Sequence, residues 1–105
     1  MSRKSELEGG INLPALRQRI DRIDHQLLRL LARRAALAQR VGRIKQQQGL
    51  SVFDGQRETA VLRQVVRANP GPLSRAAIRK IFCEILRQSR QVERQATRAQ
   101  RASHR

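Results

Sequence analysis

Apolar residues recur at intervals of three and four between residues 13 and 44, which is the spacing of one face of an α-helix. The series consists of Leu13, Leu16, Ile20, Ile23, Leu27, Leu30, Leu37, Val41 and Ile44. This seam predicts a first helix from about residue 13 to residue 48. Asn12 suits the N-cap, Pro14 suits the first turn, and Gly49 ends the helix. Such a helix is about 54 Å long, wider than a globule of this size, so we expect it to lie against a partner chain.

Arg34 occupies the position of this seam where the spacing calls for a leucine. An unpaired guanidinium is strongly unfavourable in an apolar interior, so Arg34 must meet a protein carboxylate, a bound ligand, or solvent at a gap. Lys45 lies eleven residues after Arg34, on nearly the same face of the helix and about 16 Å away. The two cations can therefore bracket one small anion. Arg17 lies about 42 Å from Lys45 along the helix, so it can serve that site only from another protomer.

A glycine inside the same helix points to a close contact. Gly42 costs about 1 kcal/mol relative to alanine in a helix interior. We therefore expect another backbone to approach the helix there.

Two further helices follow the first. After a loop over residues 49–54, a second helix is predicted from about residue 55 to 68, and the breaker Asn69-Pro70-Gly71-Pro72 precedes a third helix capped by Ser74. The apolar face of the third helix leads by steps of three and four to the polar residues Ser89 and Glu93. Beyond about Gln95 the hydrophobic pattern stops, and we expect a frayed helix end or disorder.

The resulting fold class is all-α, with three helices per chain, one of them very long. A chain of 105 residues supports one domain at most. We expect an N-terminal extension over residues 1–12, the domain over 13–95, and a basic tail over 96–105.

The formal charge of +15 raises the question of nucleic-acid binding. Most arginines are spread over the faces of the predicted helices, and only the segment from Arg94 to the end is basic without an acid. The chain has two phenylalanines and neither tryptophan nor tyrosine, so it lacks the aromatic platforms of single-strand binders. A solvated basic surface is the better interpretation, and nucleic acid is the weaker alternative.

Other composition features exclude several classes of site. A single cysteine, Cys83, permits no intramolecular disulfide and no zinc spacing, and we expect it to be half-buried and structural. No apolar run approaches the roughly 20 residues that span a bilayer, and residues 1–10 are polar. We therefore expect a cytoplasmic protein without a metal.

Three separated segments carry a resemblance to a known family. They are Leu16-Arg17-x-x-Ile20-Asp21-x-Ile23-Asp24-x-x-Leu27-Leu28-x-Leu30-Leu31-Ala32-x-Arg34, then Val41-Gly42-x-Ile44-Lys45, then Val52-Phe53-Asp54-x-x-Arg57-Glu58. In order and spacing they resemble the all-helical chorismate mutases of the shikimate pathway, over residues 13 to about 94. The resemblance implies an intertwined homodimer of three-helix chains, in which each site takes one arginine from the partner.

The implied activity is that of an isomerase, which rearranges chorismate to prephenate in aromatic amino acid biosynthesis without a cofactor or covalent intermediate. By position, Arg34 and a partner's Arg17 would bind the substrate carboxylates. Lys45 would donate to the ether oxygen as its C–O bond breaks. The resemblance also implies that Asp54 and Glu58 hold the ring hydroxyl of the substrate. It further implies that Arg57 and Ser89 line the site.

Simpler interpretations of these residues stay open. Singly, Lys45 and Arg57 are typical solvated charges at helix ends, Asp54 a helix cap and Glu58 a first-turn acid. Ser89 suits core packing. Together with Arg34 on the seam, the set favours a site.

Alternative activities also stay open. One is a lyase on the same fold that removes pyruvate from isochorismate, although the segment from Asp54 to Glu58 resembles it poorly. Others are a mutase that acts on an amino analogue and a basic nucleic-acid-binding or scaffold protein. Association with another shikimate-pathway enzyme is not decided by the sequence.

Glu93 generates a prediction about pH. Some members of the family carry a glutamine there as a second donor to the ether oxygen, and only a protonated carboxyl can donate. We expect activity to weaken as the pH rises, because the proton is lost, and Glu93→Gln to flatten the pH profile of kcat/KM. An unchanged pH dependence in that variant would contradict the assignment.

Overall fold

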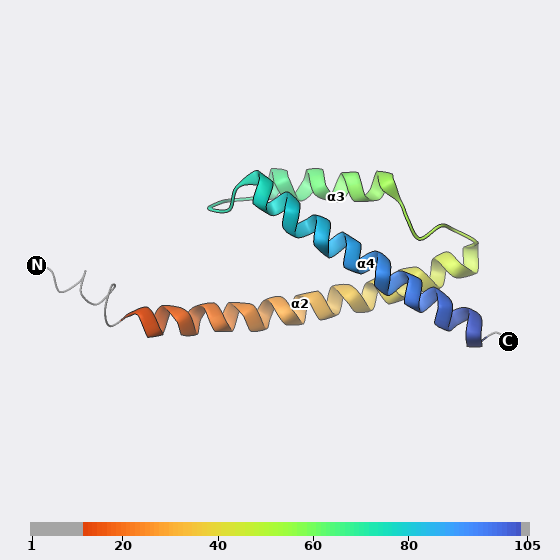
Figure 1. Ribbon diagram of the computed structural model, residues 1–105, viewed down its shortest axis with the longest axis horizontal. Helices are drawn as coiled ribbons and strands as arrows, with labels where there is room; N and C mark the ends of the chain where they lie inside the picture. The colour runs from red at the N-terminus through yellow and green to blue at the C-terminus, as the bar shows by residue number, and fades with distance from the viewer. Residues whose placement is uncertain (1–11, 104–105) are drawn as a thin grey trace, which may run out of the picture. The chain divides into compact units, whose positions relative to one another are not determined.

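Three α-helices form the part of the chain that the computed structural model describes, residues 12–103 (Figure 1). They are α2 (Asn12–Gln48), α3 (Gly55–Ala68) and α4 (Arg75–Ser103), and no strand occurs among these residues. The predicted all-α class and the three helices are confirmed. The N-terminal extension expected over residues 1–12 lies outside the described range except for Asn12, as do the last two residues of the basic tail.

The chain divides into two compact units, residues 1–34 and 35–105. The first unit, as far as it is described, is the helical stretch of α2 from Asn12 to Arg34, and no residue of that stretch is buried. Its apolar seam is open, with Ile20 55% exposed and Leu27 51% exposed. Nothing in this stretch covers the seam.

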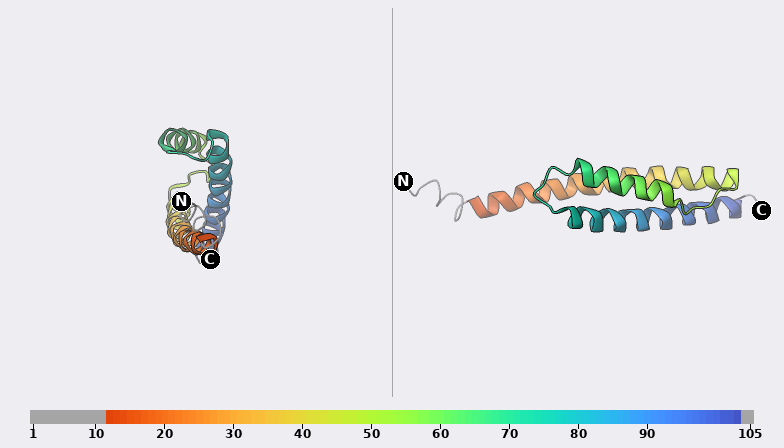
Figure 2. Two further views of the ribbon diagram at one scale, coloured as in Figure 1. Left: turned by 90° about the vertical axis from the view of Figure 1, so that its left-hand side faces the viewer. Right: turned by 90° about the horizontal axis from the view of Figure 1, so that it is seen from above.

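The second unit contains the end of α2 together with α3 and α4. Helices α3 and α4 pack side by side (Figure 2), with Val61 and Leu86 buried. The later half of α4 contacts the end of α2, where Ala38 and Gly42 are buried. The core of this unit is therefore small.

The face of α2 that contacts α4 is not the leucine seam. Leu37, Val41 and Ile44 remain 57%, 41% and 48% exposed, whereas Ala38 and Gly42, one position later in each turn, are buried. A shift of one residue turns a helix face by about 100°. The small residues therefore pack against α4, and the large apolar residues remain exposed.

The expected close approach at Gly42 is confirmed. A Cβ on Gly42 would lie 2.6 Å from the carbonyl oxygen of Glu93 and 2.9 Å from its Cα. These are backbone atoms, so no side-chain rotation relieves the clash. Only glycine therefore lets α4 approach α2 closely enough to bring Glu93 to its observed position.

The basic tail differs from the expectation of fraying or disorder. Helix α4 continues to Ser103, and Ala96 is buried with 8% exposure. Thr97 Oγ1 lies 2.8 Å from the Glu93 carbonyl and 3.3 Å from the Gly42 carbonyl, and Arg101 Nε donates to Gln46 Oε1 at 3.3 Å. Small and polar side chains hold this segment, which is why a hydrophobic pattern does not detect it.

The expectation for Cys83 is wrong: its side chain is exposed. It follows Phe82 on α4 and so faces about 100° away from the apolar face. Between residues 12 and 103, no cluster of three or more histidine, cysteine, aspartate or glutamate side chains can hold a metal ion. None of the helices in that range has the length and apolar character needed to cross a bilayer.

Candidate functional site

Most of the predicted site residues fall in the second unit. Arg17 and Arg34 belong to the first unit, where Arg17 is exposed and Arg34 is half-buried. The residues in the second unit are Lys45, Asp54, Arg57, Glu58, Ser89 and Glu93. The geometry described below is that of the second unit alone.

Lys45 links three segments of this unit. Its Nζ donates to Glu93 Oε1 on α4 at 2.8 Å and to the carbonyl oxygen of Val52, in the loop before α3, at 2.7 Å. The side chains of Lys45 and Glu93 are only 16% and 13% exposed. An ammonium carries three protons, so these two bonds leave one for a ligand.

Glu58 and Arg90 form a second half-buried ion pair beside the first. Arg90 Nη1 donates to Glu58 Oε1, and the side chains are 23% and 20% exposed for Arg90 and Glu58. The Arg90 guanidinium also lies 5.7 Å from the centroid of the Phe53 ring, a cation–π distance. One arginine thus joins α4 to the first turn of α3 and to the preceding loop.

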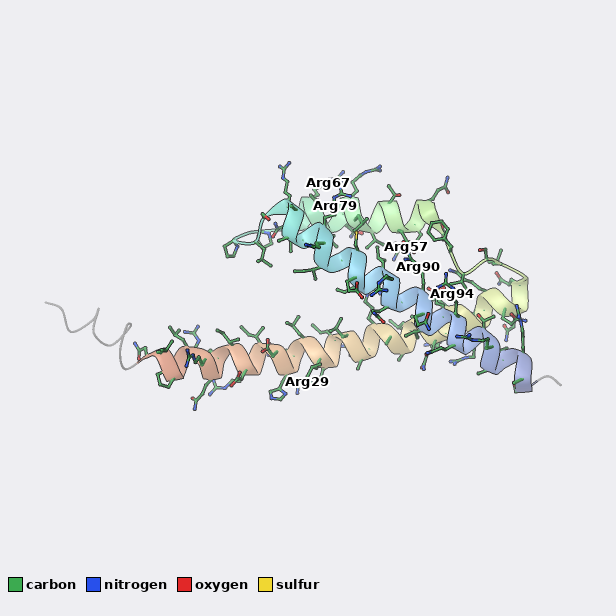
Figure 3. All side chains as sticks on the ribbon, viewed as in Figure 1. Arg29, Arg57, Arg67, Arg79, Arg90 and Arg94 are labelled. Atoms are coloured by element: carbon green, nitrogen blue, oxygen red, sulfur yellow. The ribbon has the colours of Figure 1, made fainter. Side chains whose placement is uncertain are left out.

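Arg90 was missed by the sequence analysis, although a signal was present. It follows Phe82 and Leu86 at intervals of four, on the apolar face of α4. That is the same feature, a cation where an apolar residue is due, that singled out Arg34. Figure 3 marks Arg90 and Arg94 on α4 and Arg57 on α3.

Asp54 begins α3. Its Oδ1 accepts a hydrogen bond of 3.0 Å from the backbone N–H of Arg57, so it is the N-cap. The cap fixes the first turn of α3, where Arg57 is exposed and Glu58 is half-buried. The simpler interpretation of Asp54 as a helix cap is confirmed, and its second carboxylate oxygen is not used by that bond.

Ser89 is half-buried on α4, one turn before Glu93. The structure therefore brings Lys45 and Glu93 into contact and places Glu58 and Asp54 at the start of α3. Lys45 is thus a half-buried cation, and Glu93 and Glu58 are two half-buried carboxylates. This combination suits a small ligand with both charged and hydroxyl groups.

An exposed carboxylate on α4 provides a comparison. Glu84 accepts hydrogen bonds from Arg87 Nη2 at 2.7 Å and from Gln88 Nε2 at 2.8 Å. These bonds lower the pKa of the Glu84 carboxyl, and the same pair raises the pKa of Arg87. With side chains 54% and 64% exposed for Glu84 and Arg87, solvent screens the pair.

Comparison with known proteins identifies a similar family. The model of the family described as chorismate mutase type II matches residues 16–94. The bifunctional chorismate mutase/prephenate dehydratase of Pseudomonas aeruginosa is 38% identical over 79 residues, covering 70% of this chain and 22% of that protein. The chorismate mutase of Methanocaldococcus jannaschii is 44% identical over 46 residues, covering 44% of this chain and 46% of that protein.

Solved structures agree with these matches. Form II of the chorismate mutase from Thermus thermophilus has a TM-score of 0.78 and 38% identity, over 79% of this chain and 94% of that one. Form I has a TM-score of 0.73 and 40% identity, over 74% of this chain and 98% of that one. The chain spans only about a fifth of the bifunctional relatives, 22% for the proteins of P. aeruginosa and Aquifex aeolicus.

Removal of the Glu58 carboxylate should destabilise the second unit. Glu58→Gln leaves the half-buried Arg90 without its counter-ion, and we expect a loss of about 1 kcal/mol in the free energy of unfolding. Urea unfolding followed by circular dichroism measures it. Glu84→Gln is the matched control and should change stability little, because that pair is exposed. Equal losses in both variants would show that the Glu58–Arg90 pair has no special structural role.

Proposed function

Because the chain belongs to the chorismate mutase type II family, we propose that it catalyses the rearrangement of chorismate to prephenate. The observation that carries the proposal is the half-buried Lys45 ammonium, held by Glu93 and by the Val52 carbonyl with one proton left for a ligand. The reaction is an isomerisation: an ether C–O bond breaks while a C–C bond forms. No group enters or leaves, and the residues of the site suffice without a cofactor.

Electrostatic stabilisation at the ether oxygen is the central contribution. Negative charge accumulates on this oxygen as the C–O bond breaks, and the ammonium of Lys45 donates to it. The low exposure of Lys45 strengthens the interaction, because little water screens it. Glu93 is assigned to the same site, where its carboxylate holds the Lys45 ammonium in position.

Orientation of the substrate is the other contribution. Chorismate is a dicarboxylate, and guanidinium groups bind carboxylates with two parallel hydrogen bonds. We assign its carboxylates to Arg34 and to Arg17 of a second copy, with Arg57 and Ser89 lining the site. These contacts hold the enolpyruvyl arm over the ring, near the geometry in which the new bond forms.

The ring hydroxyl is assigned to Asp54 and Glu58. Each carboxylate has an oxygen that its observed bond does not use, since Asp54 Oδ1 caps α3 and Glu58 Oε1 pairs with Arg90. Arg90 is a positioning residue in this account. It holds the Glu58 carboxylate through a hydrogen bond that leaves the second oxygen for the substrate.

A second copy of this chain is proposed to cover the seam of α2 in an intertwined homodimer. Along α2 the large apolar residues are exposed in both units, while the neighbouring small residues are the ones that α4 uses. Exposed apolar surface of this extent is unfavourable in water and marks an interaction site. The same pairing would supply Arg17 to the site of the other copy.

The name of one relative supports a proposal about the pathway. The P. aeruginosa relative is named for both a chorismate mutase and a prephenate dehydratase, which supports a role in phenylalanine and tyrosine biosynthesis. It also supports association with, or supply of prephenate to, another enzyme of that pathway. The cytoplasmic location expected from the sequence stays a proposal.

Turnover of chorismate tests the activity. Purified protein should consume chorismate and form prephenate, identified by mass and by acid conversion to phenylpyruvate. Arg34→Ala should lower kcat/KM by about a hundredfold or more, because a bidentate carboxylate contact is lost. Arg29→Ala, which removes an exposed arginine of the same helix, is the control and should retain activity. A folded protein that turns over isochorismate but leaves chorismate unchanged would contradict the proposal.

A mixed dimer tests the contribution of Arg17 from the partner. Arg17→Ala and Arg34→Ala chains, co-expressed with different tags and purified as the heterodimer, should regain about half of the wild-type activity, since one of two symmetric sites is complete. Each variant alone should be nearly inactive. A heterodimer as inactive as the two parents would show that Arg17 and Arg34 serve a site within one chain.

A further inference from the structure

A second concave surface lies at the other end of α3 from the Lys45–Glu93 pair. It is a groove of about 810 Å³ between α3 and α4, closed at one end by the turn over residues 69–73. Asn69 orders this turn, since its Nδ2 donates to the Leu73 carbonyl at 2.7 Å and its Oδ1 accepts from the Gly71 N–H at 3.0 Å. The lining begins at Thr59, next to Glu58, but none of the residues assigned to the site above belongs to it.

Four arginines line this groove from opposite sides. Arg63 and Arg67 come from α3, and Arg75 and Arg79 come from α4. Each pair is spaced by four residues, which places its two Cβ atoms on one helix face about 6 Å apart. Figure 3 shows Arg67 and Arg79 on their two helices near the turn.

The arginines have no counter-ion in the described part of the chain. All four are exposed, the groove lining includes no aspartate or glutamate, and no ion pair or side-chain hydrogen bond involves them between residues 12 and 103. Four like charges around one groove repel one another. An anion bound between them would relieve that repulsion.

Three apolar side chains also line the groove. They are Leu62 and Val66 of α3 and Leu73 of the turn. The volume of the groove lies in the range of small-molecule sites, about 300–1,000 Å³. Inorganic phosphate alone would contact the arginines and leave these apolar side chains uncovered.

We propose that this groove binds a small organic polyanion, in which two or more carboxylate or phosphate groups are attached to an apolar body. The anionic groups contact arginines of both helices, and the apolar body covers Leu62 and Val66. The two arginine positions on each helix span only about 6 Å, which suits a small molecule better than the extended backbone of a nucleic acid. The proposal does not depend on the mutase activity.

Two probes test the groove by isothermal titration calorimetry at physiological salt. Benzene-1,3,5-tricarboxylate has anionic groups on an apolar ring, whereas pyrophosphate has charge alone. We expect the tricarboxylate to bind wild-type protein more tightly. Arg67→Gln/Arg79→Gln should weaken its binding by about tenfold or more, the loss expected when charge-assisted hydrogen bonds are removed. Chorismate turnover and circular dichroism should be unchanged in that variant, which shows that it is folded.

Two further variants separate the groove from general effects. Arg40→Gln/Arg98→Gln removes the same net charge from exposed positions outside the groove and should weaken binding less than about twofold. Val66→Thr keeps all four arginines and should reduce the preference for the tricarboxylate over pyrophosphate.

Three outcomes would overturn the proposal. The first is no binding of either probe to the wild-type protein, and the second is an equal loss in the two double variants, which would assign binding to net charge. The third is tight binding of a single-stranded oligonucleotide that Arg67→Gln/Arg79→Gln abolishes while neither small probe binds, which would make the groove a nucleic-acid surface.

Discussion

The contact on which the second unit depends is the bond between the Lys45 ammonium and the Glu93 carboxylate. A half-buried ammonium is unfavourable unless acceptors surround it, and the acceptors here come from α4 and from the loop before α3. The Lys45 ammonium therefore holds these segments together, and in the proposed function it also binds the substrate. It fixes the end of α2, the loop and α4 relative to one another. In the proposed mechanism it also donates a hydrogen bond to the oxygen on which negative charge develops.

Other features of the second unit make this contact reachable. Gly42 lets the backbone of α4 approach α2, because any Cβ would meet the Glu93 backbone. Asp54 caps α3 and so sets the position of Glu58, which Arg90 then holds. A backbone constraint, a helix cap and an ion pair thus converge on one small region. Preorganisation of this kind means that few groups need to move when substrate binds.

The sequence predicts the three helices and the close approach at Gly42, because periodicity, breakers and an interior glycine are local signals. The site residues come from the resemblance together with the charge of Arg34 on the seam. A cation on the apolar face of α4 marks Arg90, but its partner, Glu58, lies 32 residues away in the sequence, so no local rule predicts their pairing. The helical tail was missed for a related reason: it is held by Ala96, Thr97 and Arg101, which carry no hydrophobic pattern.

The central claim is that the Lys45 ammonium stabilises the transition state at the ether oxygen. The most direct measurement is kcat and KM for chorismate in Lys45→Ala, beside Lys80→Ala, which removes an exposed lysine of α4. The account predicts that kcat falls by about a hundredfold or more in Lys45→Ala, with a smaller change in KM, while Lys80→Ala behaves as wild type. A folded Lys45→Ala protein with the kcat of Lys80→Ala would contradict it.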